Sequence, residues 1–430
     1  MKRKIEERLL AWKDKTNNRL PLIVNGARQV GKTYILRKFG AEQFKNVAYI
    51  NLETNLTVAS YFSDNITPER LLRYLEASTG ERIIPGETLV ILDEIQSCER
   101  ALTSLKYFCE EMPEYHIVAA GSLLGVAINR QRYSFPVGKV ETITLYPLDF
   151  EEFLWARGKE FLCEEIHRAY GVIEPLPEAL HQDAIELYRE YLLIGGMPAC
   201  INAFLSSGSF LDVPLVQNEI LDNYIADMAK YASNTDSVKI RACYNSIPAQ
   251  LAKDNKKFQY KVVQKGGSAA LFGASIEWLN LAGVVLKCQR ISQAYEPIAV
   301  YADLSAFKLY MGDVGLLTMK SGISQQTVLS GEGNTFMGAV TENYVAQQLV
   351  AKGYDLYYWE SGSTAELDFV LQKENQIIGI EVKKGEHVRS RSLGVFASSY
   401  KSAYAVRLSI KNFGEKDELK AVPLYAAFCV

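Results

Sequence analysis

Residues 20–39, "LPLIVNGARQVGKTYILRKF", decide the fold of the first third of the chain. An apolar strand leads into a loop bounded by two glycines, and a helical pattern follows at once. The loop at 26–33 fits G-x-x-x-x-G-K-[ST], a pattern in which backbone N–H groups and a helix N-terminus bind phosphate. Gly26 lets the chain leave the strand, and Gly31 brings the backbone close to a phosphate. The stretch therefore predicts a phosphate-binding loop in an α/β domain.

Two side chains of this loop suit a nucleoside triphosphate. We expect Lys32 to reach the β- and γ-phosphates and Thr33 to hold Mg²⁺, so ATP and Mg²⁺ are the predicted cofactors. The residues expected to contact the nucleotide are Gly26, Ala27, Arg28, Gln29, Val30, Gly31, Lys32, Thr33 and Tyr34.

A second apolar run, "TLVILDEIQ" (88–96), ends in two acids. Continuous Val, Ile and Leu are typical of a parallel strand that is buried on both faces, and ligands bind at the carboxyl end of such strands. We expect Asp93 to hold Mg²⁺ through water and Glu94 to polarise the attacking water. An acid pair after a strand can also be a plain helix N-cap, but the phosphate-binding loop favours the catalytic interpretation.

Two more strands are predicted, in "YHIVAAGSLLGV" (115–126) and "VETITLYPL" (140–148). Ser122 follows the first of them. It is placed either to sense the γ-phosphate or to cap the next helix, and the sequence does not decide between these roles. The pattern of strands and helices up to residue 148 predicts a doubly wound P-loop domain.

Four stretches together resemble a prokaryotic AAA-type ATPase family whose members carry a C-terminal domain of unknown function. They are residues 26–33, "LDEIQ" (92–96), "AAGSLLG" (119–125) and "FPVGKVETITLYPLDFEEFL" (135–154). The resemblance extends over nearly the whole chain and is weak through 155–240. It implies ATP hydrolysis, and a homo-oligomer because AAA-type proteins usually work as rings.

The resemblance also implies an arginine that acts on a neighbouring subunit's ATP. The family tends to show Gly-Arg before "PLDFEEF", whereas this chain has Gly138-Lys139, which puts an arginine role there in doubt. Arg130 and Arg132 lie roughly where AAA-type proteins place an arginine finger, and Arg132 is the candidate. A solvated helix end explains both arginines as well.

Residues 149–235 are helical in pattern and locally acidic. Within "YLLIGGMPACINAFL" (191–205), Gly195-Gly196 followed by Met197-Pro198 interrupts the helical pattern. The resemblance places this segment in a small helical lid over the nucleotide. An ordinary helix–helix turn is the alternative.

Residues 236–300 show three helical patterns and then a strand pair, which is the plan of a winged helix. Within them, "KDNKKFQYKVVQK" (253–265) is basic, with aromatic residues interleaved. Such a stretch either contacts DNA phosphates or is a solvated helix face. Its lysines are Lys253, Lys256, Lys257, Lys261 and Lys265, and its aromatic residues are Phe258 and Tyr260.

The last segment, 301–430, contains "ELDFVLQKENQIIGIEVKKG" (366–385), two strands joined by a polar turn. Strand alternation puts Asp368 with Glu366 on one face, and Glu381 with Lys383 on one face of the second strand. An amphipathic helix is predicted just upstream, in "GAVTENYVAQQLVAKG" (338–353).

If those acidic faces coincide, the carboxylates form an oxygen site suited to Mg²⁺, with Asp368 and Glu381 as ligands and Glu342 reaching in from the helix. Lys383 would orient the metal-bound water or stabilise the charge of the phosphorane. The arrangement resembles the restriction-endonuclease-like (PD-(D/E)xK) nuclease fold. That resemblance implies either DNA cleavage or a DNA-binding platform without cleavage.

Three basic residues follow this motif in "KKGEHVRSRS" (383–392). They are either a strip that contacts the DNA backbone or part of a solvated loop. These residues are Lys384, Arg389 and Arg391.

The composition limits the remaining possibilities. A net charge of −3 argues against a polyanion-binding surface spread over the whole protein, although a local basic patch is compatible with it. Seven scattered cysteines, without a Cys-x-x-Cys pair and with few histidines nearby, indicate free, mostly buried thiols in a reducing cytoplasm and argue against a zinc site. The charged N-terminus is not a signal peptide, and no apolar run approaches the ~18 residues of a membrane span.

The sequence thus predicts an α/β chain with four domains. These are an AAA-type P-loop ATPase domain at 1–148, a helical lid at 149–235, a winged-helix segment at 236–300 and a restriction-endonuclease-like α/β domain at 301–430. The predicted function is ATP hydrolysis coupled to action on DNA, including branched DNA. The alternatives are a nucleotide-controlled assembly switch without a DNA role, and an ATP-dependent, metal-requiring endonuclease. A metabolite kinase would leave the second half of the chain unexplained.

Overall fold

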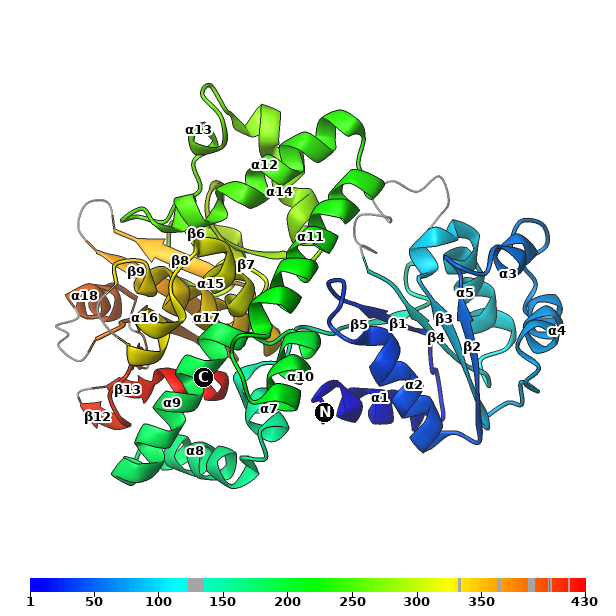
Figure 1. The fold of residues 1–430 in the computed structure, drawn as a ribbon, viewed down its shortest axis with the longest axis horizontal. Coiled ribbons are helices and arrows are strands. Elements are labelled where there is room, and N and C mark those ends of the chain that lie inside the picture. Colours follow the sequence, from blue (N-terminus) through cyan, green and yellow to red (C-terminus); the bar gives the residue numbers. More distant parts are fainter. Residues whose placement is uncertain are drawn as a thin grey trace. The chain divides into compact units, whose positions relative to one another are not determined.

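The computed structural model describes residues 1–122, 135–331, 334–361, 365–385, 391–400, 402, 404–416 and 418–430. The chain divides into two compact units (Figure 1). The N-terminal unit comprises residues 2–146 and 281–283. The C-terminal unit comprises residues 147–280 and 284–430, with Met1.

The N-terminal unit is built on a five-stranded sheet in which each pair of neighbouring strands is parallel. Strand β1 lies between β4 and β5, and β3 lies between β2 and β4. This confirms the predicted parallel α/β sheet. Across the sheet, the strands are β2 (Asn46–Asn51), β3 (Thr88–Asp93), β4 (His116–Ala120), β1 (Leu22–Asn25) and β5 (Glu141–Thr144).

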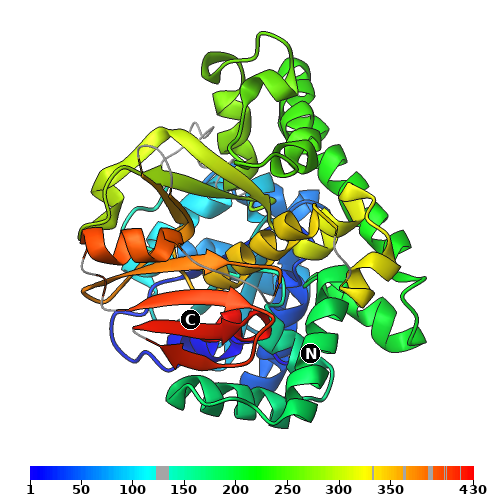
Figure 2. The same ribbon diagram turned by 90° about the vertical axis from the view of Figure 1, so that its left-hand side faces the viewer.

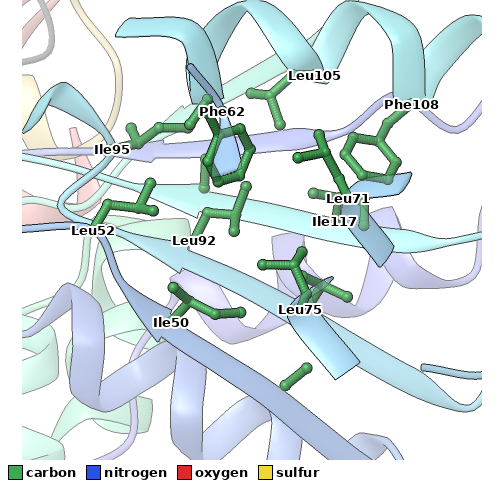
Figure 3. Packing of buried hydrophobic residues seen from close by; sticks show 14 of the residues in the cluster. Ile50, Leu52, Phe62, Leu71, Leu75, Leu92, Ile95, Leu105, Phe108 and Ile117 are labelled. Atoms are coloured by element: carbon green, nitrogen blue, oxygen red, sulfur yellow. The ribbon is translucent and has the colours of Figure 1, made fainter. Parts of the chain in front are cut away.

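Helices cover both faces of this sheet because its buried strands are apolar on both sides. Val90 and Leu92 of β3 belong to one core cluster with residues of α3, α4 and α5. Figure 3 shows Leu92 beside residues of this cluster such as Phe62 and Leu75. On the opposite face, Leu89 lies against α2 near Gly40. The helices of this unit are α1 (Ile5–Lys13), α2 (Lys32–Gln43), α3 (Leu56–Tyr61), α4 (Pro68–Thr79), the short η1 (Ile95–Ser97) and α5 (Glu99–Glu111).

The C-terminal unit begins with helices, as the pattern of residues 149–235 predicts. They are α7 (Phe150–Ala156), α8 (Glu160–Val172), α9 (Glu178–Ile194), α10 (Pro198–Ser207), α11 (Val213–Tyr231), α12 (Asn234–Leu251), α13 (Tyr260–Val263) and α14 (Ala269–Leu281). Later helices are η2 (Ile298–Tyr301), α15 (Val314–Ser321), α16 (Gln325–Ser330), α17 (Met337–Ala351), α18 (Arg391–Tyr400) and η3 (Leu424–Cys429).

An eight-stranded mixed sheet forms the centre of this unit, with its C-terminal strands in the foreground of Figure 2. In spatial order the strands are β12 (Gly414–Lys416), β13 (Leu419–Pro423), β11 (Ala405–Ser409), β10 (Gln376–Val382), β9 (Glu366–Lys373), β8 (Tyr357–Glu360), β6 (Val285–Ile291) and β7 (Ala302–Met311). Helix α17 packs against this sheet and is buried on nearly all sides, so the expected amphipathic helix is instead a central one.

The segment predicted as a winged helix has helices α12, α13 and α14 followed by the antiparallel pair β6–β7. Lys257 also forms an isolated bridge with Lys308 of β7. Strand β7 lies beyond residue 300, and β6 pairs in parallel with β8. The hairpin is therefore part of the large sheet, and the three predicted C-terminal domains share one compact unit. Their boundaries stay a prediction.

The Gly195-Gly196 turn joins α9 to α10 and is anchored by a buried aspartate. Asp313, before α15, accepts a hydrogen bond from Gly196 N–H at 2.6 Å. The Gly196 carbonyl in turn accepts one from Leu148 N–H at 2.8 Å. Burial raises the pKa of Asp313 to about 6. The turn is thus fixed to the start of the C-terminal unit and to α15, whereas its predicted role as a lid remains untested.

All seven cysteines are free thiols, as their spacing predicts. Among the helices that the structure describes, none combines the length and the apolar character needed to cross a membrane.

Candidate functional site

The loop between β1 and α2 has a backbone that requires glycine at its first position. Gly26 has a φ of +145°, and a Cβ there would lie 2.2 Å from the carbonyl oxygen of Leu145. Gly31 has a φ of +96° and directly precedes α2. Residues with a side chain rarely adopt such φ values. Both glycines therefore keep the loop close to the sheet and leave its N–H groups available to a phosphate.

Lys32 is held at this loop by its own backbone. Its ammonium donates hydrogen bonds to the carbonyl oxygens of Gly26 at 2.9 Å and Ala27 at 2.7 Å, and the side chain is buried. Phosphate oxygens are stronger acceptors for an ammonium than neutral carbonyls are. A triphosphate in the loop can therefore replace these carbonyls as partners of Lys32.

Asp93 at the carboxyl end of β3 meets the loop. Its Oδ2 accepts hydrogen bonds from Thr33 Oγ1 at 2.7 Å and from the Tyr49 hydroxyl at 2.9 Å. Burial and the nearby Asp93 carboxylate raise the pKa of Tyr49, so the phenol keeps its proton and remains a donor. Thr33 and Asp93, predicted from distant stretches of sequence, thus lie together at the edge of the sheet and present oxygen ligands of the type that Mg²⁺ prefers.

Glu94 follows directly in an unusual conformation. Its φ is +51°, a left-handed value that is uncommon for a non-glycine residue and is often found at functional sites. The carboxylate accepts a hydrogen bond from the side-chain amide of Gln96. Glu94 is therefore held by a neutral donor that a water molecule could replace.

The structure shows the positions of two other predicted residues of this site, and two more lie outside the described residues. Ser122 is buried just beyond β4, where Gly121 N–H donates to the Val24 carbonyl of β1 at 3.4 Å. This puts Ser122 at the same edge of the sheet as the loop. Tyr34, in the first turn of α2, is exposed. The arginine-finger candidate Arg132, and Arg130 with it, lie outside the described residues.

Two residues of this site were not predicted from the sequence. Tyr49 lies on β2 and contacts Asp93 because β2 pairs with β3, with Asn51 opposite Asp93. Gln96 lies two residues beyond the acid that it contacts. The position of Gln96, two residues after Glu94, was a signal in the sequence that could have predicted this contact. The contact of Tyr49 could not be predicted in this way, because it depends on the order of the strands.

The second predicted cluster lies where β9 and β10 separate. The two strands pair as far as Ile380 opposite Phe369, with Gly379 opposite Val370. This register places Asp368 and Glu381 on the same face, as expected from strand alternation. Beyond the paired residues, the Asp368 carboxylate accepts a hydrogen bond from Val382 N–H at 2.8 Å.

Three lysines lie in this cluster, and only Lys383 was predicted there from the sequence. Lys308 of β7 is almost fully buried, and its ammonium lies 2.6 Å from Glu366. Lys256 forms an ion pair with Glu342 of α17, and Lys383 lies 2.8 Å from Glu381. We call these three lysines, together with Glu342, Glu366, Asp368 and Glu381, the lysine–carboxylate cluster. A lysine within the apolar run "AFKLYM" (306–311) was the signal in the sequence.

Burial and charge act in opposite directions on these groups. Burial, with Asp368 nearby, raises the pKa of Glu342, whereas the two lysines lower it. Burial would lower the pKa of Lys308, but Glu342, Asp368 and Glu366 raise it above its usual value. Burial also raises the pKa of Glu381, an effect that Lys383 opposes. Lys308 therefore stays charged and neutralises the surrounding acids.

The predicted Mg²⁺ site at Asp368 and Glu381 stays a prediction, because the described geometry addresses only a site with three side-chain ligands. Among the described residues, Glu342, Asp368 and Glu381 do not bring three ligand oxygens close enough together to share one ion. Lys256 holds Glu342, and Lys308 holds Glu366. An ion that uses Glu342 would compete with the Lys256 ammonium for that carboxylate.

The basic stretch is less exposed than its sequence suggests. Lys256 and Lys257 turn toward acids, Lys257 at 2.6 Å from Glu360. Phe258 is a core residue stacked on Phe307, with ring centroids 5.3 Å apart.

The rest of that stretch and the strip after Lys383 keep basic groups at the surface. Lys261 and Lys265 remain exposed. Lys384 donates to the Asn334 carbonyl at 2.9 Å. Arg391 begins α18 and is exposed, and Arg389 lies outside the described residues.

Three family descriptions match the sequence in turn. Residues 18–154 match an "AAA domain", 185–327 match "Domain of unknown function (DUF8612)" and 337–427 match "Domain of unknown function (DUF4143)". Uncharacterized proteins of Mycobacterium bovis and Mycobacterium tuberculosis are each 37% identical to this chain over 79 residues. That stretch is 18% of this chain and 18% of each relative.

Solved structures with similar arrangements include two archaeal proteins. A Walker-type ATPase of Pyrococcus abyssi is 16% identical, with a TM-score of 0.44, over 74% of this chain and 95% of that one. The ORC2 protein of Aeropyrum pernix is 13% identical, with a TM-score of 0.38, over 79% and 94%. At such scores neither likeness establishes a common architecture for the whole chain. The family match, the loop and the parallel sheet together identify residues 18–154 as a P-loop domain of the AAA type.

Proposed function

We propose that this protein binds and hydrolyses ATP and couples the nucleotide state to action on DNA through its C-terminal unit. The observation that carries the ATPase part is the meeting of Lys32, Thr33 and Asp93 at the carboxyl edge of one parallel sheet. These are the groups that a Mg–nucleotide requires, and they come from two separate stretches of the chain.

Each residue has a distinct part in the proposed hydrolysis. The loop N–H groups and Lys32 bind the β- and γ-phosphates once the ammonium leaves the Gly26 and Ala27 carbonyls. Thr33 and Asp93 would hold Mg²⁺, which neutralises phosphate charge when bound. Glu94 exchanges its bond with Gln96 for the attacking water and orients it toward the γ-phosphate. Tyr49 orients Asp93 through its hydroxyl.

Asp93→Asn is expected to lower ATP turnover by about 10- to 100-fold, the usual cost of losing a residue that orients a metal or its water. Added Mg²⁺ should restore part of the rate, because the loss is one of metal affinity. Phosphate release measured across a Mg²⁺ series checks this. Unchanged turnover at low Mg²⁺ would contradict the assigned role. Asp64→Asn, an exposed acid outside the site, is the matched control.

The DNA part of the proposal rests on the C-terminal unit. The order α12, α13, α14 and then the hairpin β6–β7 follows the plan of a winged helix, and Lys261 and Lys265 on and after α13 are exposed. The order α17, β8, β9, β10 supports a restriction-endonuclease-like domain. Because lysines neutralise its acids, a platform that binds DNA without cutting it is favoured over an endonuclease.

A gel shift with duplex, single-stranded, forked and four-way DNA, with and without ATP, tests this part. We expect Lys261→Glu/Lys265→Glu to weaken binding and to reduce the salt dependence of log K by roughly 2, about 0.9 for each lost phosphate contact. Lys106→Glu, on exposed surface of α5, should leave binding unchanged. Equal affinity of the double variant, or no binding to any DNA, would remove DNA from the proposal.

The second candidate function is a nucleotide-controlled assembly switch with little turnover and no DNA role. The hydrogen bond that holds Glu94 on Gln96 is compatible with such a slow enzyme. Homo-oligomer formation and a cytoplasmic location belong to the proposal as well. Mass measured with and without nucleotide separates the two functions: a nucleotide-dependent mass without DNA binding favours the switch.

A further inference from the structure

Three side chains of different chemical types meet at the surface of the C-terminal unit, apart from both sites described above. Glu151 lies in the first turn of α7, and Cys163 and His167 lie on α8. Glu151 Oε1 is 2.7 Å from His167 Nε2 and 3.5 Å from Cys163 Sγ. The three ligand atoms all lie within 4.8 Å of one another.

Local structure explains why these residues converge. Cys163 and His167 are four residues apart, so their side chains share one face of α8. The Asp149–Glu152 capping box fixes the start of α7 and with it the position of Glu151. Helices α7 and α8 and the terminal η3 pack together, so the group rests on three elements.

The imidazole of His167 is oriented from its other side. The Phe428 ring lies edge-on to it with centroids 5.3 Å apart, and Cys429 Sγ lies 3.7 Å from Nδ1. Ligand histidines usually hydrogen-bond through their second nitrogen to a carboxylate, a backbone carbonyl or water, and here the Cys429 sulfur takes that place. The His167 side chain is 48% exposed, which leaves a path for an ion.

We propose that Glu151, Cys163 and His167 bind one Zn²⁺ ion. A thiolate, an imidazole and a carboxylate form a ligand set suited to zinc and unsuited to Mg²⁺ or Ca²⁺. Tetrahedral bonds of the usual lengths put oxygen and sulfur ligands roughly 3.5 Å apart, as Glu151 and Cys163 already are. The same bond lengths put oxygen and nitrogen ligands roughly 3.3 Å apart, so the Glu151–His167 pair must open by about 0.6 Å from its 2.7 Å, and a water or a partner's ligand takes the fourth position.

Binding of Zn²⁺ at this site should depend on pH, because the ligands must be deprotonated to bind the ion. Zn²⁺ takes the lone pair of His167 Nε2, so the imidazole proton has to sit on Nδ1, facing the Cys429 sulfur. The Cys163 thiol releases its proton to solvent. The affinity for Zn²⁺ should therefore rise with pH. If Glu151 and His167 form only an ion pair, the protein should not bind Zn²⁺ there.

Titration of Co²⁺ into the chelator-treated full chain tests the site, because Co²⁺ reports thiolate ligation through a charge-transfer band. We expect one equivalent to bind with that band and tetrahedral d–d bands, and Zn²⁺ to displace it. Cys163→Ser should lose the charge-transfer band, and His167→Gln should weaken binding at least roughly tenfold. Cys109→Ser, a partly buried thiol of the N-terminal unit, is the control and should bind normally.

His167 is exposed, so His167→Gln should fold even if Cys163→Ser does not. The absence of a charge-transfer band in the unmodified chain would overturn the proposal, and so would equal affinity of His167→Gln. The site goes beyond the ATPase function and is independent of it. Lys32→Ala should therefore bind Co²⁺ normally, whatever happens to ATP turnover.

Discussion

Lys32→Ala is expected to abolish measurable ATP hydrolysis. The ammonium is the cation that the loop directs at the phosphates, and its present partners are two neutral carbonyls that compete weakly. Removing one such electrostatic contact costs about 10²–10³ in kcat, and the loss of nucleotide affinity adds to this. Phosphate release from the full chain at saturating Mg–ATP is the measurement.

Two further variants make this result specific. Lys38→Ala lies on the same helix, but its partners are Glu6 and Glu42 at the surface, so turnover should be unchanged. Glu94→Gln should bind ATP normally and lose hydrolysis, since it keeps the loop and removes the base. Undiminished phosphate release from Lys32→Ala would end the ATPase proposal and move the assembly switch into first place.

The sequence predicts the P-loop unit well because its signals are local. A strand, two glycines and a lysine within residues 20–39 define the loop, and the apolar run before Asp93 defines its partner strand. The order of the strands, with β4 between β3 and β1, brings the loop and Asp93 together. No local pattern in the sequence encodes that order. Tyr49 was missed for this reason, because its contact with Asp93 depends on β2 lying next to β3.

The C-terminal unit was harder to predict because its charges are paired over long sequence distances. Strand alternation gave the correct faces for Asp368 and Glu381. The composition of the basic stretch predicts a surface patch, yet Lys256 reaches Glu342 on α17, and Phe258 joins the core on Phe307. Charge density alone does not distinguish a solvated lysine from one that neutralises a buried acid.

Lys308→Met is expected to destabilise the C-terminal unit by about 3–5 kcal/mol, the usual cost of breaking a buried ion pair from one side. The ammonium is almost fully buried and neutralises Glu366 directly and Glu342 and Asp368 through space. Thermal unfolding with and without ATP identifies the affected unit, because nucleotide should stabilise the transition of the N-terminal unit.

The matched control is Lys287→Met, on the neighbouring strand β6. Its ammonium is 3.9 Å from Glu277, and that pair is partly exposed, so the expected loss is about 1 kcal/mol or less. The double variant Lys308→Met/Glu366→Gln removes one acid along with the lysine and should recover part of the stability. Equal stability of Lys308→Met and the unmodified chain would show that the cluster is not neutralised by Lys308.

The pH dependence of the stability of Lys308→Met tests independently whether Lys308 acts through its charge. Burial already raises the pKa of Glu342 in the folded protein. Without the Lys308 charge, that pKa should rise further, so folded Lys308→Met takes up a proton at a pH where the unfolded chain does not. Stability of the variant should therefore increase as pH falls toward the ordinary glutamate range, and its deficit relative to the unmodified chain should narrow. A deficit that stays constant from neutral to mildly acidic pH would attribute the loss to packing of the lysine stem instead of its charge.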